Sequence, residues 1–183
     1  MLATAKAIKV INQLRDEGII SRYAIGGAVG AVFYIEPTQT QDIDVFLLES
    51  TPGSLIVSTE PITERLKQLG YSRWSEDKLV VEGWPVQFLP AAKLIEREAI
   101  TQATEKLIAE GVAALVPPAE YLMAIAIDLG RPKDVVRLYQ FHTEQAYDPE
   151  KLRVLLMKHS ITEKWDRTLQ LFKVQEESYP SAE

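Results

Sequence analysis

The chain has 183 residues, 46% of them hydrophobic and 25% charged, which is typical of a globular protein with one core or a core with a small appendage. Its net charge of -6 argues against broad, nonspecific attraction to nucleic acid, and the lack of cysteine excludes disulfides and thiolate metal sites. No apolar run is long enough to span a bilayer and residues 1–16 lack a signal-peptide core, so we expect a cytoplasmic protein without membrane contact.

Helix and strand patterns alternate over the first two thirds of the chain. An apolar stripe before Gly18 predicts a helix over residues 3–17, and Thr59, as an N-cap, predicts a second helix from Pro61 to Leu69. The other patterns predict short helices from Ala28 and over residues 91–99, a turn at 51–54, and strands at 23–25, 42–48, 55–57, 71–74, 78–82 and 85–89. Residues 106–109 and 112–116 favour a hairpin, with a helix through Leu107 as the alternative.

The last third of the chain has helical patterns only. Residues 119–128 are apolar on nearly every side, which predicts a buried helix, and Pro132 begins a second one. Asp148 before Pro149 predicts a third start, and Ser160 with Glu163 has the spelling of a capping box for a fourth. We therefore predict an α+β protein with a mixed-sheet core over residues 1–118 and a helical region over residues 119–183.

One stretch carries most of the chemical information. Gly26 and Gly27 break an apolar strand, and the backbone N–H groups that follow point outward, which suits a phosphate. Asp42 and Asp44 are two positions apart on the next predicted strand, so their carboxylates project on one face and can hold a hard cation such as Mg²⁺. Carboxylates beside a phosphate cradle indicate phosphoryl or nucleotidyl transfer, whereas the plainer interpretation has both aspartates simply facing water.

The ordered motif, Gly26-Gly27 followed by Thr40-x-Asp42-Ile43-Asp44, resembles the DNA polymerase β-type nucleotidyltransferase superfamily, and most of all its AbiEii-like and minimal nucleotidyltransferase branches. A second stretch, Gly130-Arg131-Pro132-Lys133-Asp134 after an apolar helix, also resembles AbiEii-like proteins. The resemblance implies a mixed-sheet core with flanking helices. It also implies that Asp42 and Asp44 are the catalytic Mg²⁺ ligands. The nucleoside triphosphate contacts that it implies are Gly26, Gly27, Ala28, Thr40, Arg131 and Lys133.

The resemblance leaves the acceptor open between RNA, a protein side chain and a small molecule, and relatives in toxin–antitoxin pairs suggest an antitoxin partner.

The chain departs from the family pattern at two places. Gln87 stands where a third acidic metal ligand is expected, although glutamine is a poorer Mg²⁺ ligand, and Ala126 stands in place of a lysine. Glu82 is a possible substitute for the missing acid or a solvated turn residue. These departures favour the alternative, a degenerate member that binds a nucleotide or a partner protein without catalysis.

Other polar and aromatic residues have a second interpretation. Arg131 and Lys133 can instead pair with Asp128 and Asp134 at the helix junction. We expect His142 and His159 at the surface, and we expect Trp74, Trp84 and Trp165 in the core rather than on a base-stacking platform.

Overall fold

The computed structural model describes residues 2–37, 39–48 and 58–178, so the turn predicted at 51–54 and the strand predicted at 55–57 lie outside the described residues. The chain divides into two compact units, one comprising Met1–Phe33 with Pro37–Pro118 and the other Tyr34–Glu36 with Ala119–Glu183.

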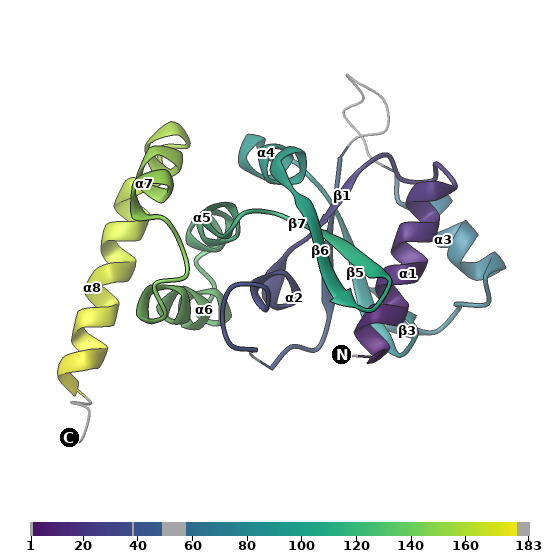
Figure 1. The fold of residues 1–183 in the computed structure, drawn as a ribbon, viewed down its shortest axis with the longest axis horizontal. Coiled ribbons are helices and arrows are strands. Elements are labelled where there is room, and N and C mark those ends of the chain that lie inside the picture. The colour runs from purple at the N-terminus through teal and green to yellow at the C-terminus, as the bar shows by residue number, and fades with distance from the viewer. Residues whose placement is uncertain (1, 38, 49–57, 179–183) are drawn as a thin grey trace. The chain divides into compact units, whose positions relative to one another are not determined.

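The first unit is built on a mixed five-stranded sheet, which confirms the predicted α+β class (Figure 1). The strands lie in the order β1 (Tyr23–Ile25), β2 (Ile43–Leu47), β5 (Trp84–Pro90), β4 (Lys78–Val81) and β3 (Trp74–Ser75). The β2–β5 pair is parallel and the other three pairs are antiparallel. A parallel pair needs a crossover connection, which here includes α3 (Glu60–Gln68).

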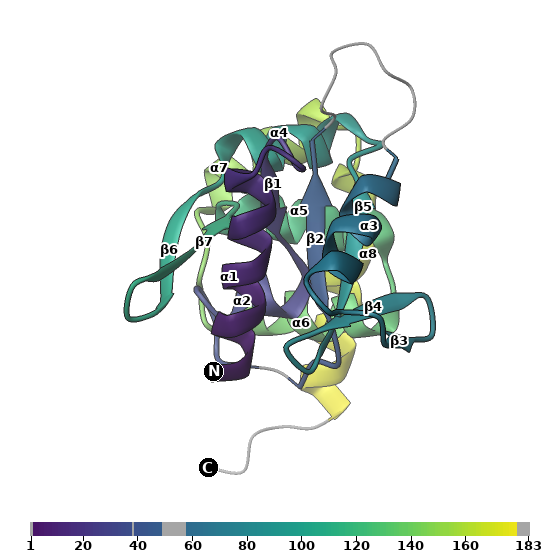
Figure 2. The same cartoon turned by 90° about the vertical axis from the view of Figure 1, so that its right-hand side faces the viewer.

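Helices cover both faces of this sheet (Figure 2). Helix α1 (Leu2–Asp16) and α3 lie on one face, and α2 (Gly27–Ala31) and α4 (Leu94–Gln102) on the other. The first face forms the apolar core, since the predicted stripe of α1 and the inward residues of the strands are almost fully buried: Ala7, Ile8, Ile11, Leu14, Tyr23, Ile25, Ile43, Val45, Leu79 and Val86. The helices α1 and α3 begin and end within two residues of the predicted bounds, but Thr59 makes no side-chain cap for α3.

Strands β6 (Thr104–Ala109) and β7 (Val112–Val116) form a separate antiparallel hairpin with an irregular register between Leu107 and Ala109. This confirms the predicted hairpin, and the alternative of a helix through Leu107 is wrong.

The second unit contains α5 (Ala119–Leu129), α6 (Pro132–Thr143), α7 (Pro149–Lys158) and α8 (Thr162–Ser178), as the last third of the sequence predicts. Residues 122–127 of α5 are all buried. The carboxylate of Asp148 accepts hydrogen bonds from the N–H groups of Glu150 and Lys151, so it is the N-cap of α7. Within the described part of the chain, no helix has the length and apolar character needed to cross a bilayer.

The predicted capping box at Ser160 is wrong. Helix α8 begins at Thr162, and Ser160 instead closes α7 with a left-handed φ of 57°. The N–H of Ser160 donates to the carbonyl of Met157, and that of Ile161 to the carbonyl of Leu156. This is the Schellman pattern of a helix end, with serine at the position that glycine favours.

Candidate functional site

The turn after β1 is tied to β2 by its first glycine. The N–H of Gly26 donates to the carbonyl of Asp44 at 2.9 Å, so this amide is already used inside the protein. A β-carbon on Gly26 would lie 2.2 Å from Cε2 of Phe46, which means that the ring of Phe46 requires glycine at this position. The predicted contact of the Gly26 amide with a phosphate stays a prediction, and it would have to share this amide with the carbonyl of Asp44.

Gly27 lies directly against the carboxylate of Asp44. Its φ is 56°, a left-handed value, and a β-carbon there would lie 2.1 Å from Asp44 Oδ2. The N–H of Gly30 is the first in α2 to donate within the helix, to the carbonyl of Gly26. The N–H groups of Gly27 and Ala28 therefore have no acceptor within α2. They lie at the start of this helix, next to the carboxylate of Asp44.

Asp42 precedes β2, which begins at Ile43, so the prediction that both aspartates lie on the strand is wrong for Asp42. The hydroxyl of Thr40 donates to the carbonyl of Asp42 at 3.1 Å, so Thr40 fixes the backbone of this aspartate. Lys78 Nζ donates to Asp42 Oδ2 at 2.7 Å, and the side chains of Lys78 and Asp42 are only 19% and 12% exposed. This hydrogen bond raises the pKa of Lys78, which keeps its ammonium charged beside Asp42.

Gln87 is the direct neighbour of Asp44 across the parallel β2–β5 pair. Residues paired in this way project from the same face of a sheet, and the approach of Asp44 to Gly27 shows that this is the face that carries α2. The β4–β5 register ends at the pair Leu79–Val86, so Lys78 and Gln87 each adjoin the last pair of this ladder. Asp44, Gln87 and Lys78 lie on three adjacent strands, and we call these three residues the acid–amide–lysine row.

Among the described residues, the site has no third carboxylate to join Asp42 and Asp44. Within the described ranges, no group of three or more Asp, Glu, His or Cys side chains is placed to hold a metal ion. Glu82 does not fill the gap, because it accepts a hydrogen bond from the hydroxyl of Tyr71 at 2.6 Å, in a turn where its own φ is 51°. Burial and this hydrogen bond raise the pKa of Tyr71 to about 12. Glu82 is therefore a turn residue, but it is half-buried rather than solvated.

Arg131 and Lys133 belong to the second unit. The guanidinium of Arg131 donates to Asp134 through Nε at 2.6 Å and through a second nitrogen at 3.2 Å, and Arg137 donates to the same carboxylate at 3.2 Å. Asp134 is 1% exposed, so this ion pair holds the start of α6. Lys133 is exposed, and Asp128 pairs with Lys164. Arg131 thus has the structural partner that its second interpretation names.

Three aromatic placements differ from expectation. Trp74 is 49% exposed, because β3 is a two-residue strand at the edge of the sheet. Trp84 is only half-buried, whereas Trp165 is buried as expected. His142 is half-buried rather than exposed, since its ring packs against Trp165 and Phe172 and its Nδ1 lies 3.2 Å from the hydroxyl of Tyr147.

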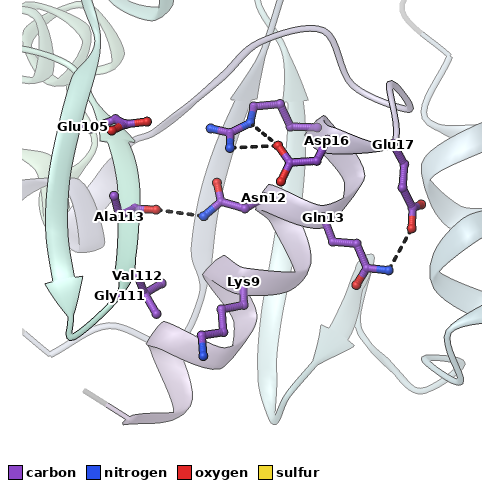
Figure 3. A pocket seen from close by; sticks show the side chains of 10 residues that line it. Lys9, Asn12, Gln13, Asp16, Glu17, Glu105, Gly111, Val112 and Ala113 are labelled. Carbon is purple, nitrogen blue, oxygen red and sulfur yellow. Dashed lines mark hydrogen bonds and ion pairs between the residues drawn. The ribbon is translucent and has the colours of Figure 1, made fainter.

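A pocket of about 520 Å³ lies between α1 and the β6–β7 hairpin (Figure 3). Its charged lining consists of the cations Lys9 and Arg15 and the anions Asp16, Glu17 and Glu105. Several of its polar groups bind one another: Arg15 pairs with Asp16, and the side-chain amide of Asn12 donates to the carbonyl of Ala113 at 2.8 Å. With more anions than cations, this pocket does not suit a triphosphate.

Comparison with known proteins supports the fold. No family model and no curated protein matches the chain. Among solved structures, the chain is similar to an antigenic nucleotidyltransferase-like protein from Paracoccidioides brasiliensis, with a TM-score of 0.52 and 17% sequence identity. The likeness covers 76% of this chain and 74% of the other. The chain therefore has a nucleotidyltransferase-like fold.

Proposed function

We propose that this protein binds a nucleoside triphosphate at the turn of Gly27 and Ala28 and transfers the nucleoside monophosphate to an acceptor hydroxyl. The observation that carries the proposal is the contact between Gly27 and the carboxylate of Asp44, which brings backbone amides and a carboxylate to one point. An amide donor and a metal-binding carboxylate are the two groups that a phosphate chain needs together.

The donor set fits a hard divalent cation. Asp42 and Asp44 are carboxylates, the ligands that Mg²⁺ prefers, and Mg²⁺ commonly uses one or two carboxylates while it keeps several waters. Asp44 and Asp42 would hold the ion, and Gln87 would offer only a neutral amide oxygen from the neighbouring strand. When bound, Mg²⁺ neutralises the negative charge that develops on the phosphate oxygens.

Different residues would have different roles in the transfer. The amides of Gly27 and Ala28 orient the phosphates, and Thr40 holds the backbone of Asp42 through its 3.1 Å hydrogen bond. An acceptor hydroxyl attacks the α-phosphorus, the bond from that phosphorus to the oxygen of the β-phosphate breaks, and pyrophosphate leaves. Transfer of this type depends mainly on position and on charge stabilisation.

For the acceptor, the resemblance in the sequence favours RNA, a protein side chain or a small molecule, and we propose an antitoxin as a partner on the same basis. The AbiEii-like branch and the nucleotide contacts of Arg131 and Lys133 also remain proposals. Arg131 would have to contact the nucleotide while it holds Asp134.

A second candidate function is nucleotide binding without transfer. Two observations favour it: Gln87 stands next to Asp44 where a further acid would complete the site, and Lys78 binds Asp42. Both reduce the negative charge with which the site attracts a metal ion.

Incubation of the protein with nucleoside triphosphates labelled on the α-phosphate or on the γ-phosphate, with Mg²⁺ and total RNA or protein, tests the proposal. Transfer predicts that α-label is retained on an acceptor and that γ-label leaves as pyrophosphate. Binding of nucleotide without any α-label transfer would favour the second candidate. The variant Asp44→Asn is the control, because it should abolish transfer while it keeps the size of the side chain.

A further inference from the structure

One of the two aspartates of the candidate site, Asp42, already has a cation as its partner. Lys78 Nζ is 2.7 Å from Asp42 Oδ2, and both side chains are shielded from solvent. An ion pair this well shielded is weakened less by water than an exposed pair. The negative charge of Asp42 is therefore already compensated from within the protein.

The register explains why the lysine reaches this place. Lys78 is the first residue of β4 and precedes Leu79, whose partner Val86 precedes Gln87, the neighbour of Asp44. Across the acid–amide–lysine row the charge thus changes from negative through neutral to positive. An aspartate at position 87 would stand on β5, the strand between those of Asp44 and Lys78, whereas glutamine adds no charge there.

We propose that Lys78 acts as a built-in cation of this site, competing with divalent metal for Asp42. This inference rests on the proposed function, since it assigns the metal to Asp42 and Asp44. Lys78 would be a positioning residue that holds Asp42 in place while no metal is bound.

Three variants separate the charge of Lys78 from its length. Lys78→Met removes the charge and keeps an unbranched side chain, Lys78→Gln removes it with a polar end, and Lys78→Arg keeps it. Mn²⁺ binding to the full chain without nucleotide, followed by electron paramagnetic resonance of free Mn²⁺, gives affinity and stoichiometry directly. Melting in the presence of a chelator identifies the variants that are folded and can be compared.

We expect Lys78→Met and Lys78→Gln to bind Mn²⁺ about tenfold more tightly than wild type and Lys78→Arg do, since a neighbouring cation has been removed. Unchanged Mn²⁺ affinity in both neutral variants would overturn the role of Lys78. If Asp44→Asn still abolished Mn²⁺ binding in that case, the proposed function would stand without it. Absence of Mn²⁺ binding from every variant would overturn the inference as well, and α-label transfer would then decide the proposed function separately.

Discussion

The carboxylate of Asp44 occupies the space that a side chain at Gly27 would need, with only 2.1 Å between Oδ2 and a β-carbon built on Gly27. The glycine is therefore required by the folded protein itself, before any ligand binds. Substitution at position 27 tests the packing of the site more directly than it tests phosphate binding.

Gly27→Ala should lower the free energy of unfolding by about 3 kcal/mol, from the clash with Asp44 together with a left-handed φ. Gly111→Ala is the matched control, because Gly111 has a φ of 68° and a β-carbon there would have nothing within 4 Å, so it should cost only about 1 kcal/mol. Urea unfolding measures both, and equal losses would contradict the clash. Adding Asp44→Ala should recover part of the loss in Gly27→Ala, as a double-mutant cycle would show.

Ser160→Gly should stabilise the protein by about 1 kcal/mol, since Ser160 holds a left-handed φ of 57° at the end of α7. The hydrogen bonds of that helix end come from backbone N–H groups, which glycine retains. Ser160→Ala is the control and should give no gain, because alanine keeps a β-carbon. If urea unfolding showed Ser160→Gly to be no more stable than Ser160→Ala, the relief of backbone strain in the folded state would be cancelled by the higher conformational entropy of glycine in the unfolded chain.

Asp134→Asn should destabilise the protein by about 3 kcal/mol, because it leaves two guanidinium groups without their buried anion. The two arginines should then differ from each other, since Arg137 is 11% exposed and Arg131 is 46% exposed. We expect Arg137→Gln to lower the melting temperature more than Arg131→Gln does. The reverse order would mean that exposure does not decide the strength of these two pairs.

Glu17 gives a pH test. Hydrogen bonds from Arg65 and then from Gln13 lower the pKa of Glu17 from 4.5 to about 2. A depressed folded-state pKa stabilises the protein above about pH 4.5, and this contribution is lost as the pH falls toward 2. The melting temperatures of wild type and Glu17→Gln should therefore differ at pH 6 and converge toward pH 2, and a difference that stays constant over this range would contradict the assignment.

Local patterns predict most of the fold. The apolar stripe of α1, the hairpin of β6 and β7 and the four helices after Pro118 all follow from periodicity and from turn residues. The prediction fails at Ser160 because a serine before Thr162 and Glu163 has the same spelling whether it begins a helix or ends the previous one. The backbone torsion that separates the two cases depends on how α7 ends.

The candidate site is less accessible to sequence reasoning. Gly26, Gly27, Asp42 and Asp44 are close in sequence, so their motif can be recognised directly. Lys78 cannot be found in this way because it reaches Asp42 from a strand 36 residues later, and no local pattern gives the register of β4 on β5. The place of Gln87 beside Asp44 depends on a second register, that of β2 on β5, which no local pattern gives either.

Gln87→Asp is the sharpest test of the row. The new carboxylate would stand beside Asp44, on the strand next to that of Lys78, so it would repel the aspartate and attract the lysine. We therefore expect only a modest loss without metal, about 2–4 °C in melting temperature, and a larger gain with Mg²⁺ than wild type shows, because a second adjacent carboxylate adds a preferred ligand.

The control is Gln87→Asn, which has nearly the size of aspartate and no charge. If Mg²⁺ raises the melting temperature of Gln87→Asp and of Gln87→Asn by the same amount, position 87 is not at the metal site and Gln87 does not stand in the place of a third acidic ligand. Combining Gln87→Asp with Lys78→Met should give the strongest apo destabilisation and the tightest Mg²⁺ binding of the set, because three carboxylates then share one face without an internal cation. Such a protein should also transfer α-label faster than wild type if the charge of the site limits catalysis.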